Sequence, residues 1–253
     1  ESRDIAGQYN IRSIDQLKSE YPNIDWTAYF VGIGLPAVDK VCVDNPKGMT
    51  EVNSLFKSLT DKEIRDYVAF EYVSSASGSL SDEFTEANFE MFSRTMSGAK
   101  EQQPRWKRAL AVPNGLLGEA VGKLYVEKYF PAKSKQKMLD LVNNLKIALG
   151  EHIAALDWMS DRTKVNALVK LNSFKVKIGY PDTWKDYSGL AVDPKLSYWE
   201  NIKNARQFRA EDQYSKWGKP VDREEWGMTP QTVNAYYTPT TNALCFPAGI
   251  LPA

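Results

Sequence analysis

The amino-acid sequence predicts a mainly α protein of the α+β class, in which many helices are followed by a single C-terminal β-hairpin. Apolar residues recur at helical spacing through most of the chain before residue 225. Residues 232–251, TVNAYYTPTTNALCFPAGIL, instead crowd apolar and aromatic side chains around a Thr-Pro-Thr-Thr-Asn turn. The 253 residues are 43% hydrophobic, which is enough for a substantial core. We therefore expect a mainly helical region over residues 1–225 and a β-hairpin segment over residues 226–253.

The charge balance excludes two classes of partner. Lysine plus arginine equals aspartate plus glutamate at 32 each, so no net field attracts nucleic acid or an anionic membrane. No apolar run approaches the roughly 20 residues that a membrane-spanning helix needs. The first ten residues, ESRDIAGQYN, lack the basic start and the apolar stretch of an export signal. We expect no nucleic-acid partner and no membrane-spanning segment in this chain.

Local signals divide the first hundred residues into short helices. Ser13 is the expected N-cap of a helix that stops before Pro22, and Asn23 or Asp25 is the expected cap of the next. The valines of AVDKVCVDN alternate loosely with polar residues, which predicts a short strand. Two further helices are expected over DKEIRDYVAFEYVSSAS, with Asp61 near its cap, and SDEFTEANFEMFSRTMSG.

The middle of the chain predicts a helix that breaks at Pro113-Asn114-Gly115 and then restarts. Gly118 and Gly122 favour close approach of another backbone, because a phosphate-binding loop would need a preceding strand and a different glycine spacing. The remaining elements are expected to be a long helix over 134–159, a helix from Ser160 or Asp161 to Gly179, a connection over 182–195 and a helix ending before Gly218.

The single histidine, His152, limits the chemistry of this chain. Zinc sites in hydrolases usually use two or more histidines, and Ser-His-Asp or Cys-His mechanisms need one that is placed by its neighbours. His152 lies beside the apolar stripe of a long predicted helix, so we interpret it as a structural or solvated residue. Cys42 and Cys245 have no metal-ligand spacing and are expected to be buried thiols, with a disulfide left open. We assign no catalytic residue and no metal ligand.

Asn234 is the unusual residue of the predicted hairpin. The first strand is expected to place Val233, Ala235 and Tyr237 on one face and Asn234 and Tyr236 on the other. A turn over residues 238–242 and a return strand over 243–246 would follow. Strand interiors disfavour asparagine. On an edge strand its amide can hydrogen bond to a peptide laid alongside, whereas elsewhere it faces solvent or satisfies a loop. The pattern alone leaves both interpretations open.

The segment VNAYYTPTTNALCFPAGIL resembles a family pattern, that of the neprilysin and endothelin-converting-enzyme metallopeptidases, which include bacterial endopeptidase O. Further segments resemble the same family in the same order: RWKRALAVPNGLLGEAVGKLYVEKYFPAKSK, LDWMSDRTKVNALVK and IGYP. The resemblance covers roughly residues 100–251, and more weakly IDWTAYF; Cys245 stands where the family usually has an aliphatic residue. It implies that Asn234 and Ala235 bind the backbone of an oligopeptide substrate, and that the helices help to enclose the active site.

The resemblance also implies a zinc ion, held in the family by a His-Glu-x-x-His helix and a downstream glutamate. A chain with one histidine cannot contain that motif. We therefore expect zinc in a full-length parent, none bound by this chain, and a C-terminal catalytic part of the same protein as its missing partner. The family favours an exported bacterial protein, periplasmic or in the cell envelope.

Two other functions stay open from the residues alone. The 7 Trp and 13 Tyr could serve a non-catalytic helical binding module for peptides or glycans, although most such residues belong to cores. A purely structural scaffold is the third possibility. The adjacent acids Glu224 and Glu225 do not indicate acid–base catalysis, because neighbouring side chains diverge on a helix or a strand.

Overall fold

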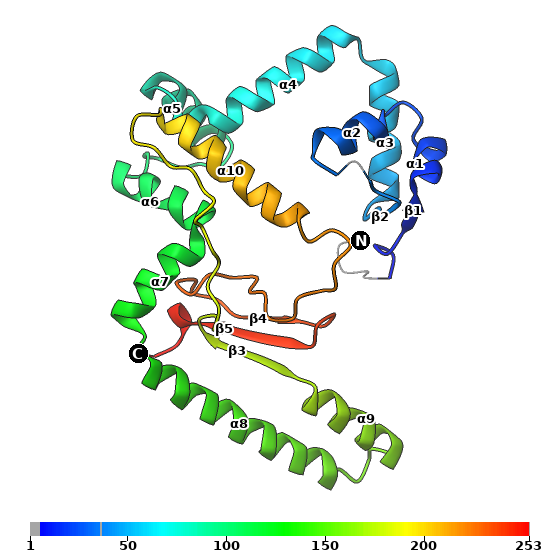
Figure 1. Ribbon diagram of the computed structural model, residues 1–253, viewed down its shortest axis with the longest axis vertical. Coiled ribbons are helices and arrows are strands. Elements are labelled where there is room, and N and C mark those ends of the chain that lie inside the picture. The colour runs from blue at the N-terminus through cyan, green and yellow to red at the C-terminus, as the bar shows by residue number, and fades with distance from the viewer. Residues whose placement is uncertain (1–5, 36, 253) are drawn as a thin grey trace. The chain divides into compact units, whose positions relative to one another are not determined.

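The computed structural model describes residues 6–35 and 37–252, and its chain forms two compact units. One unit combines Glu1–Gln102 with Val192–Trp217, and the other combines Gln103–Ala191 with Gly218–Ala253. Figure 1 shows that helices make up most of both units and that the strands are short. The predicted mainly α fold is confirmed.

The first unit contains a two-stranded antiparallel sheet, β1 with β2, and most of the short helices. Its elements are β1 (Ile11–Ser13), α1 (Ile14–Glu20), α2 (Trp26–Gly32), β2 (Lys40–Cys42), α3 (Pro46–Ser58), α4 (Asp61–Ala76), a 3₁₀ turn (Ser77–Ser79), α5 (Asp82–Asn88), a π-helical stretch (Phe89–Thr95) and α10 (Tyr198–Tyr214).

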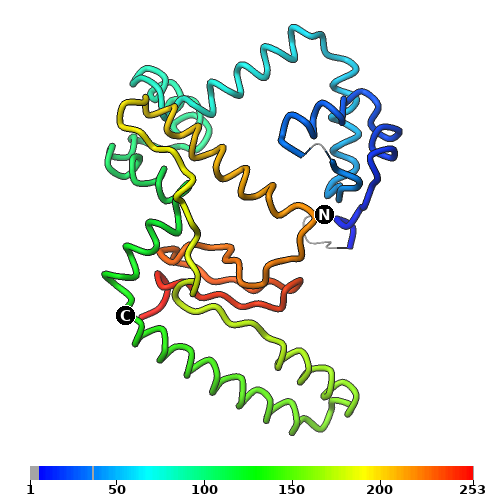
Figure 2. The backbone as a smooth tube through the Cα atoms, in the orientation of Figure 1, coloured from blue at the N-terminus to red at the C-terminus, as the bar shows by residue number. Residues whose placement is uncertain are grey.

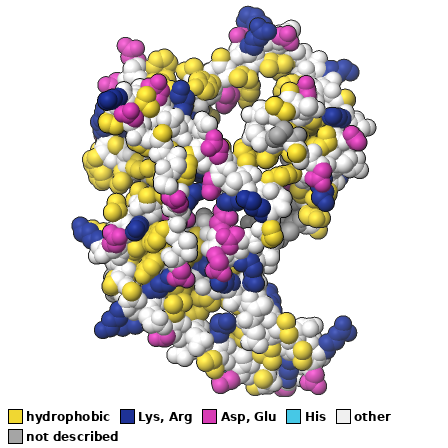
Figure 3. Space-filling view, viewed as in Figure 1, with side chains coloured by type: hydrophobic (Ala, Val, Ile, Leu, Met, Phe, Trp, Pro, Cys, Tyr) yellow, Lys and Arg dark blue, Asp and Glu magenta, His cyan; other side chains and the backbone are white. Residues whose placement is uncertain are grey.

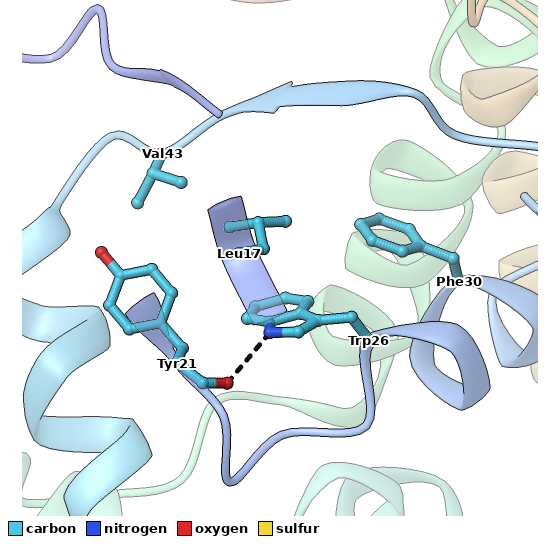
Figure 4. Packing of buried hydrophobic residues seen from close by; sticks show 5 residues of the cluster. All are labelled: Leu17, Tyr21, Trp26, Phe30 and Val43. Atoms are coloured by element: carbon cyan, nitrogen blue, oxygen red, sulfur yellow. Dashed lines mark hydrogen bonds between the residues drawn. The ribbon is translucent and has the colours of Figure 1, made fainter. Parts of the chain in front are cut away.

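The core of this unit gathers around α1 and α2. Figure 4 shows Leu17, Tyr21, Trp26, Phe30 and Val43 packed together, and all five side chains are buried. The indole N–H of Trp26 donates to the carbonyl oxygen of Tyr21 at 3.2 Å, so the polar atom of this buried ring is satisfied. The apolar rings and aliphatic side chains thereby fix α1, α2 and β2 as one cluster.

The helix starts of this unit follow the predicted caps. Ser13 accepts from the N–H of Gln16, whose side chain accepts from Ser13 in return, which completes a capping box. Asp25 caps α2 through the N–H of Ala28. The cap of α4 is Thr60, one residue before the Asp61 that we expected near it.

The last helix of the unit, α10, packs on α4. The rings of Tyr72 and Trp199 meet edge to face with centroids 5.8 Å apart. The guanidinium of Arg206 lies over the Trp199 ring and donates to the carbonyl of Ser75 at 3.2 Å. A cation–π contact and a hydrogen bond therefore join segments that are far apart in the sequence.

The second unit holds four helices and a three-stranded sheet among its described residues. Its elements are α6 (Arg105–Leu116), α7 (Gly118–Tyr129), α8 (Ala132–Ala155), α9 (Asp161–Asn172), β3 (Lys175–Gly179), β4 (Tyr236–Thr238), β5 (Ala243–Pro247) and a 3₁₀ turn (Ala248–Ile250). The strand order is β3-β5-β4, with β3 parallel and β4 antiparallel to β5. Figure 2 shows β3 and β5 side by side although a long stretch of chain separates them.

The strand β3 corrects the prediction of a helix running to Gly179. The helix α9 ends at Asn172, and Lys175–Gly179 pairs with β5 instead. Val176 and Ile178 alternate with lysines, which is a two-residue period, and β5 supplies the partner that a local pattern cannot reveal. At the end of β3, Gly179 has φ +76° and lies against Phe130, where a Cβ would come within 2.6 Å of the ring. Glycine is therefore required there.

The two cysteines differ in their surroundings. Both are free thiols; Cys245 is buried, as predicted, whereas Cys42 is exposed and its Sγ lies 3.2 Å from the carbonyl oxygen of Gln8. The prediction of burial was therefore wrong for Cys42. On the face seen in Figure 3, basic and acidic side chains are interspersed, in keeping with the balanced composition.

Candidate functional site

Asn234 and Ala235 lie directly before β4, at the exposed border of the small sheet. The Asn234 side chain is exposed, Ala235 is half-buried, and the preceding Val233 is 76% exposed. The Oδ1 of Asn234 accepts from the N–H of Ala235 at 2.8 Å. Both residues therefore stand at the surface with a local hydrogen bond between them.

The first hairpin strand is shorter than expected, because it begins at Tyr236 instead of Val233. Two physical causes are visible. The pairing of Tyr236 with Cys245, continued by two residues, would set Asn234 opposite Pro247, which has no N–H to donate. In addition, the Asn234 side chain engages the next backbone N–H, which competes with ladder formation. Asn234 is thus at a strand end and not in a strand interior.

The strand β4 is an edge of the β3-β5-β4 sheet in the described chain. In an antiparallel pair, alternate backbone N–H and C=O groups of an edge strand point away from the partner. An extended peptide can add to such an edge through main-chain hydrogen bonds. The sheet therefore offers the geometry that strand addition needs, next to Asn234.

The segment before Asn234 is held by three glycines. A Cβ on Gly118 would lie 2.4 Å from Thr229, one on Gly122 would lie 2.6 Å from Pro230, and one on Gly249 would lie 2.6 Å from the carbonyl oxygen of Gln231. The predicted role of Gly118 and Gly122 in close packing is confirmed. Helix α7 can approach residues 229–231 because its Gly118 and Gly122 carry no side chain.

Gln231 adds hydrogen bonds to this contact. Its Nε2 donates to the Oδ1 of Asn114 and to the carbonyl oxygen of Gly118, each at 3.1 Å. Its buried Oε1 has no hydrogen-bond partner among the described residues and faces Gly122, whose Cα–H groups are weak donors. The chain therefore enters the exposed stretch at Val233 from a rigid anchor.

On one face of the sheet, burial shifts the pKa values of three neighbouring groups. It raises the pKa of Cys245 to about 11 and that of Tyr236 to about 12, and it lowers the pKa of Lys177. Cys245 and Tyr236 therefore stay protonated at neutral pH. Because the nucleophilic form is the thiolate or the phenolate, neither group is a nucleophile at neutral pH, and both act as neutral hydrogen-bonding groups.

The described residues do not form a zinc site. No group of three or more His, Cys, Asp and Glu side chains that could hold a metal occurs among them. His152 is exposed in the last turn of α8. In the part of the chain that the structure describes, no helix is both long and apolar enough to cross a membrane.

Comparison with known proteins gives a consistent result. The sequence profile of peptidase family M13 matches residues 1–181. Neprilysin-1 of Caenorhabditis elegans is 32% identical over 98% of this chain and 35% of its own length. The neutral endopeptidase of Lactobacillus helveticus is 33% identical over 99% of this chain and 39% of its own length.

Two solved structures share the fold. The zinc metalloprotease Zmp1 of Mycobacterium tuberculosis, in its open state, matches 99% of this chain and 39% of its own chain with a TM-score of 0.90 and 37% identity. PepO of Lactobacillus rhamnosis matches 98% of this chain and 39% of its own, with a TM-score of 0.82 and 25% identity. The chain thus spans well under half the length of these relatives. The resemblance to the neprilysin and endothelin-converting-enzyme family is confirmed, and the chain belongs to peptidase family M13.

Proposed function

We propose that this chain is a portion of a zinc-dependent endopeptidase that hydrolyses oligopeptides, and that it supplies the strand that binds the substrate backbone. The observation that carries the proposal is the Asn234-Ala235 pair, an exposed asparagine followed by a half-buried alanine, directly before an edge strand. Membership of family M13 supports the peptidase chemistry. The helical region 1–225 would contribute to an enclosure over the active site, and residues 226–253 would be the hairpin segment of the catalytic domain.

The amide group of Asn234 has the chemistry for this contact. Its Oδ1 is engaged by the N–H of Ala235, so we infer that its Nδ2, with two N–H donors, is the atom that binds a ligand. A peptide laid along β4 presents backbone carbonyl oxygens as acceptors. We infer that Asn234 donates to a substrate carbonyl while its oxygen holds Ala235 in place.

Zinc would be held outside these 253 residues. The chain has one histidine and spans 35% to 39% of the relatives named above, so the metal and its ligands belong, in this proposal, to the remaining polypeptide. That catalytic part would be the partner of the hairpin. By itself, the chain would bind peptide but not hydrolyse it.

The test is hydrolysis of an internally quenched oligopeptide by the full-length peptidase carrying Asn234→Ala. Loss of one or two substrate hydrogen bonds should lower kcat/KM by about tenfold to a hundredfold. Asn144→Ala, at an exposed asparagine of α8, is the matched control and should turn over normally. Wild-type kcat/KM in Asn234→Ala would remove the assigned role.

A second variant separates the two atoms of the amide. Asn234→Asp keeps an oxygen that can accept from the Ala235 N–H but removes the Nδ2 donor. If Asn234 donates to substrate, the Asp variant should lose activity as the Ala variant does. Activity retained by Asp and lost by Ala would mean that Asn234 only shapes the local backbone.

The compartment is a further part of the proposal. Bacterial relatives at 33% and 37% identity support a bacterial enzyme. Export to the periplasm or the cell envelope is the part of the proposal that rests on the family resemblance. Fractionation of the source cells, with immunodetection of the full-length protein, tests this. Recovery only with a cytoplasmic marker enzyme would contradict it.

A further inference from the structure

Three side chains form a row across the sheet, on the face opposite that of Ile178. Lys177 of β3 is the register partner of Cys245 of β5, and Tyr236 of β4 is the register partner of the same cysteine. Direct cross-strand partners share one face, with Cβ atoms about 4.5–5.5 Å apart. Lys177 is 6% exposed and Cys245 is 0% exposed. A buried lysine is thus one end of a row that passes through Cys245 and ends at Tyr236 on the edge strand.

The Lys177 amino group has a specific acceptor. Its Nζ donates to the carbonyl oxygen of Glu225 at 2.5 Å. A charged amine taken out of water is costly unless it is hydrogen-bonded or paired. The bond between Lys177 and the Glu225 carbonyl therefore compensates the burial, and it joins β3 to the segment that leads toward β4.

Tyr236, at the other end of the row, is also hydrogen-bonded to the segment that leads toward β4. The hydroxyl oxygen of Tyr236 accepts from the N–H of Gly227 at 2.7 Å, and Tyr236 is the register partner of Cys245. Gly227 also lies close to the Tyr236 ring, because a Cβ there would meet its atoms at 3.4 Å. The backbone at 225 and 227 is therefore tied to both outer strands of the sheet.

We propose that Lys177 is a positioning residue: its hydrogen bond to the Glu225 carbonyl, in a row with Cys245 and Tyr236, holds the segment 225–235 in the conformation that presents Asn234. The role in peptide binding rests on the function proposed above. The glycine contacts at residues 229–231 hold the middle of the same segment. Removal of the lysine should therefore loosen the start of the segment through Glu225, and its exposed end through Cys245 and Tyr236 of the row. Lys177 touches no substrate and acts through the backbone.

Lys175 offers a matched control. It lies two residues earlier on the same face of β3 and forms an ion pair with Glu224, but its side chain is 37% exposed. Exposed ion pairs contribute little to stability. Lys175→Met therefore removes a charge and an ion pair from the same strand without removing the buried hydrogen bond.

The experiment compares Lys177→Met with Lys175→Met in the full-length peptidase. Methionine keeps the length and apolar stem of the lysine but cannot donate. We expect amide hydrogen exchange in the segment 227–235 to be about tenfold faster in Lys177→Met and unchanged in Lys175→Met. The KM for an oligopeptide should rise about threefold to tenfold with kcat nearly unchanged, because substrate binding is affected and not the reacting groups.

Wild-type exchange and KM in Lys177→Met would overturn the positioning role. Faster exchange spread over α8, α9 and the strands alike would also overturn it, since that result means general destabilisation. Should Lys177→Met fail to fold, Tyr236→Phe removes the acceptor of the Gly227 N–H while the ring remains. It should show the same local increase in exchange, and wild-type exchange in that variant would overturn the proposal.

The experiments distinguish failure of the proposed peptide-binding function of Asn234 from failure of the positioning role of Lys177. If Asn234→Ala turns over normally while Lys177→Met still shows faster exchange at residues 227–235, the lysine holds the segment but the segment does not bind substrate. If Asn234→Ala loses activity while Lys177→Met behaves as wild type, the function stands and the positioning role is lost.

Discussion

The Nδ2 of Asn242 lies 2.8 Å from the carbonyl oxygen of Lys170, so a turn of the hairpin caps the last turn of α9. The final carbonyls of a helix have no partner within the helix, and here a distant residue supplies one. Asn242 also donates to the Oγ of Ser173 at 3.0 Å and accepts from the hydroxyl of Tyr237 at 3.1 Å. One side chain thus joins the helix end, the turn and β4.

Asn242→Ala should therefore lower the free energy of unfolding by about 1–3 kcal/mol. Asn242 has φ 48°, a left-handed conformation that asparagine and glycine tolerate better than alanine. Urea unfolding of the Ala and Gly variants separates the causes. Glycine should avoid the strain that alanine suffers at a positive φ, so Asn242→Gly should lose only the stability contributed by the side-chain hydrogen bonds. Two variants within 0.5 kcal/mol of wild type would contradict this role.

Gly122→Ala should destabilise the protein by about 1–3 kcal/mol, because the new methyl group would meet Pro230 at 2.6 Å. Gly150→Ala is the control. A Cβ there would meet Leu171 at 3.6 Å, an ordinary contact, and the helix interior of α8 favours alanine by about 0.5–1 kcal/mol. The two variants should thus shift the melting temperature in opposite directions. A shift of the same sign in both would refute the close contact at Gly122.

The two thiols should differ in reactivity. Iodoacetamide at pH about 8 should label the exposed Cys42 in the native protein and leave the buried Cys245, whose raised pKa keeps the thiol protonated, unmodified. Peptide mass mapping should show one labelled cysteine before unfolding and two afterwards. Rapid native labelling of Cys245 would show that the strand face is open to solvent.

Alkaline pH should weaken the fold through the same face of the sheet. The pKa of Cys245 rises from its ordinary 9.0 to about 11 and that of Tyr236 from 10.0 to about 12. The folded state holds these protons more tightly, so their contribution is complete below the ordinary pKa and is lost as pH rises through the folded pKa. Lys177 acts in the opposite sense, because burial lowers its pKa and the unfolded chain binds more protons between the folded pKa and the ordinary 10.5.

Cys245→Val removes the thiol, whose rise in pKa from 9.0 to about 11 corresponds to about 2–3 kcal/mol in the free energy of unfolding. The variant should lose less stability than wild type between pH about 9 and 11, as measured by urea unfolding at each pH. Parallel curves for the two proteins would contradict the raised pKa of Cys245.

His152→Gln should leave the turnover of the full-length peptidase within about twofold of wild type, a small change in barrier. The side chain is exposed in the last turn of α8, apart from the sheet residues that the proposed function uses. Kinetics with the same oligopeptide substrate check this. A large loss of kcat would give His152 a role that neither its exposure nor its helix position indicates.

Much of the fold could be predicted where the signal is local. Ser13 and Asp25 cap helices because their short polar side chains reach backbone N–H groups two or three residues on. A helix break followed by a restart was also predicted, but at Pro113-Asn114-Gly115; helix α6 runs through these residues and ends at Leu116, and α7 restarts at Gly118. The strand β3 could not be recognised in the same way, because its five residues gain a strand conformation only by pairing with β5.

The candidate site shows the same division. Asn234 could be singled out because asparagine is unusual in an apolar hairpin, and the family resemblance gave it a role. Nothing local distinguishes Lys177 from Lys175, two residues earlier in the same strand. Only the register with Cys245 and the carbonyl of Glu225 makes one lysine buried and leaves the other partly exposed. A long-range pairing decides their difference.

The parallel pairing of β3 with β5 has a consequence for biosynthesis. Lys177 and its partner Cys245 are separated by a stretch that includes all of α10, which belongs to the other compact unit. At about 5–20 residues per second, a ribosome needs several seconds to produce β5 after β3 has been made. During that interval β3 lacks its neighbouring strand β5. Ile178, which is nearly fully buried in the folded protein, is then without the packing that the finished sheet provides. Slow translation of this stretch should therefore increase the demand for chaperones in the producing cell.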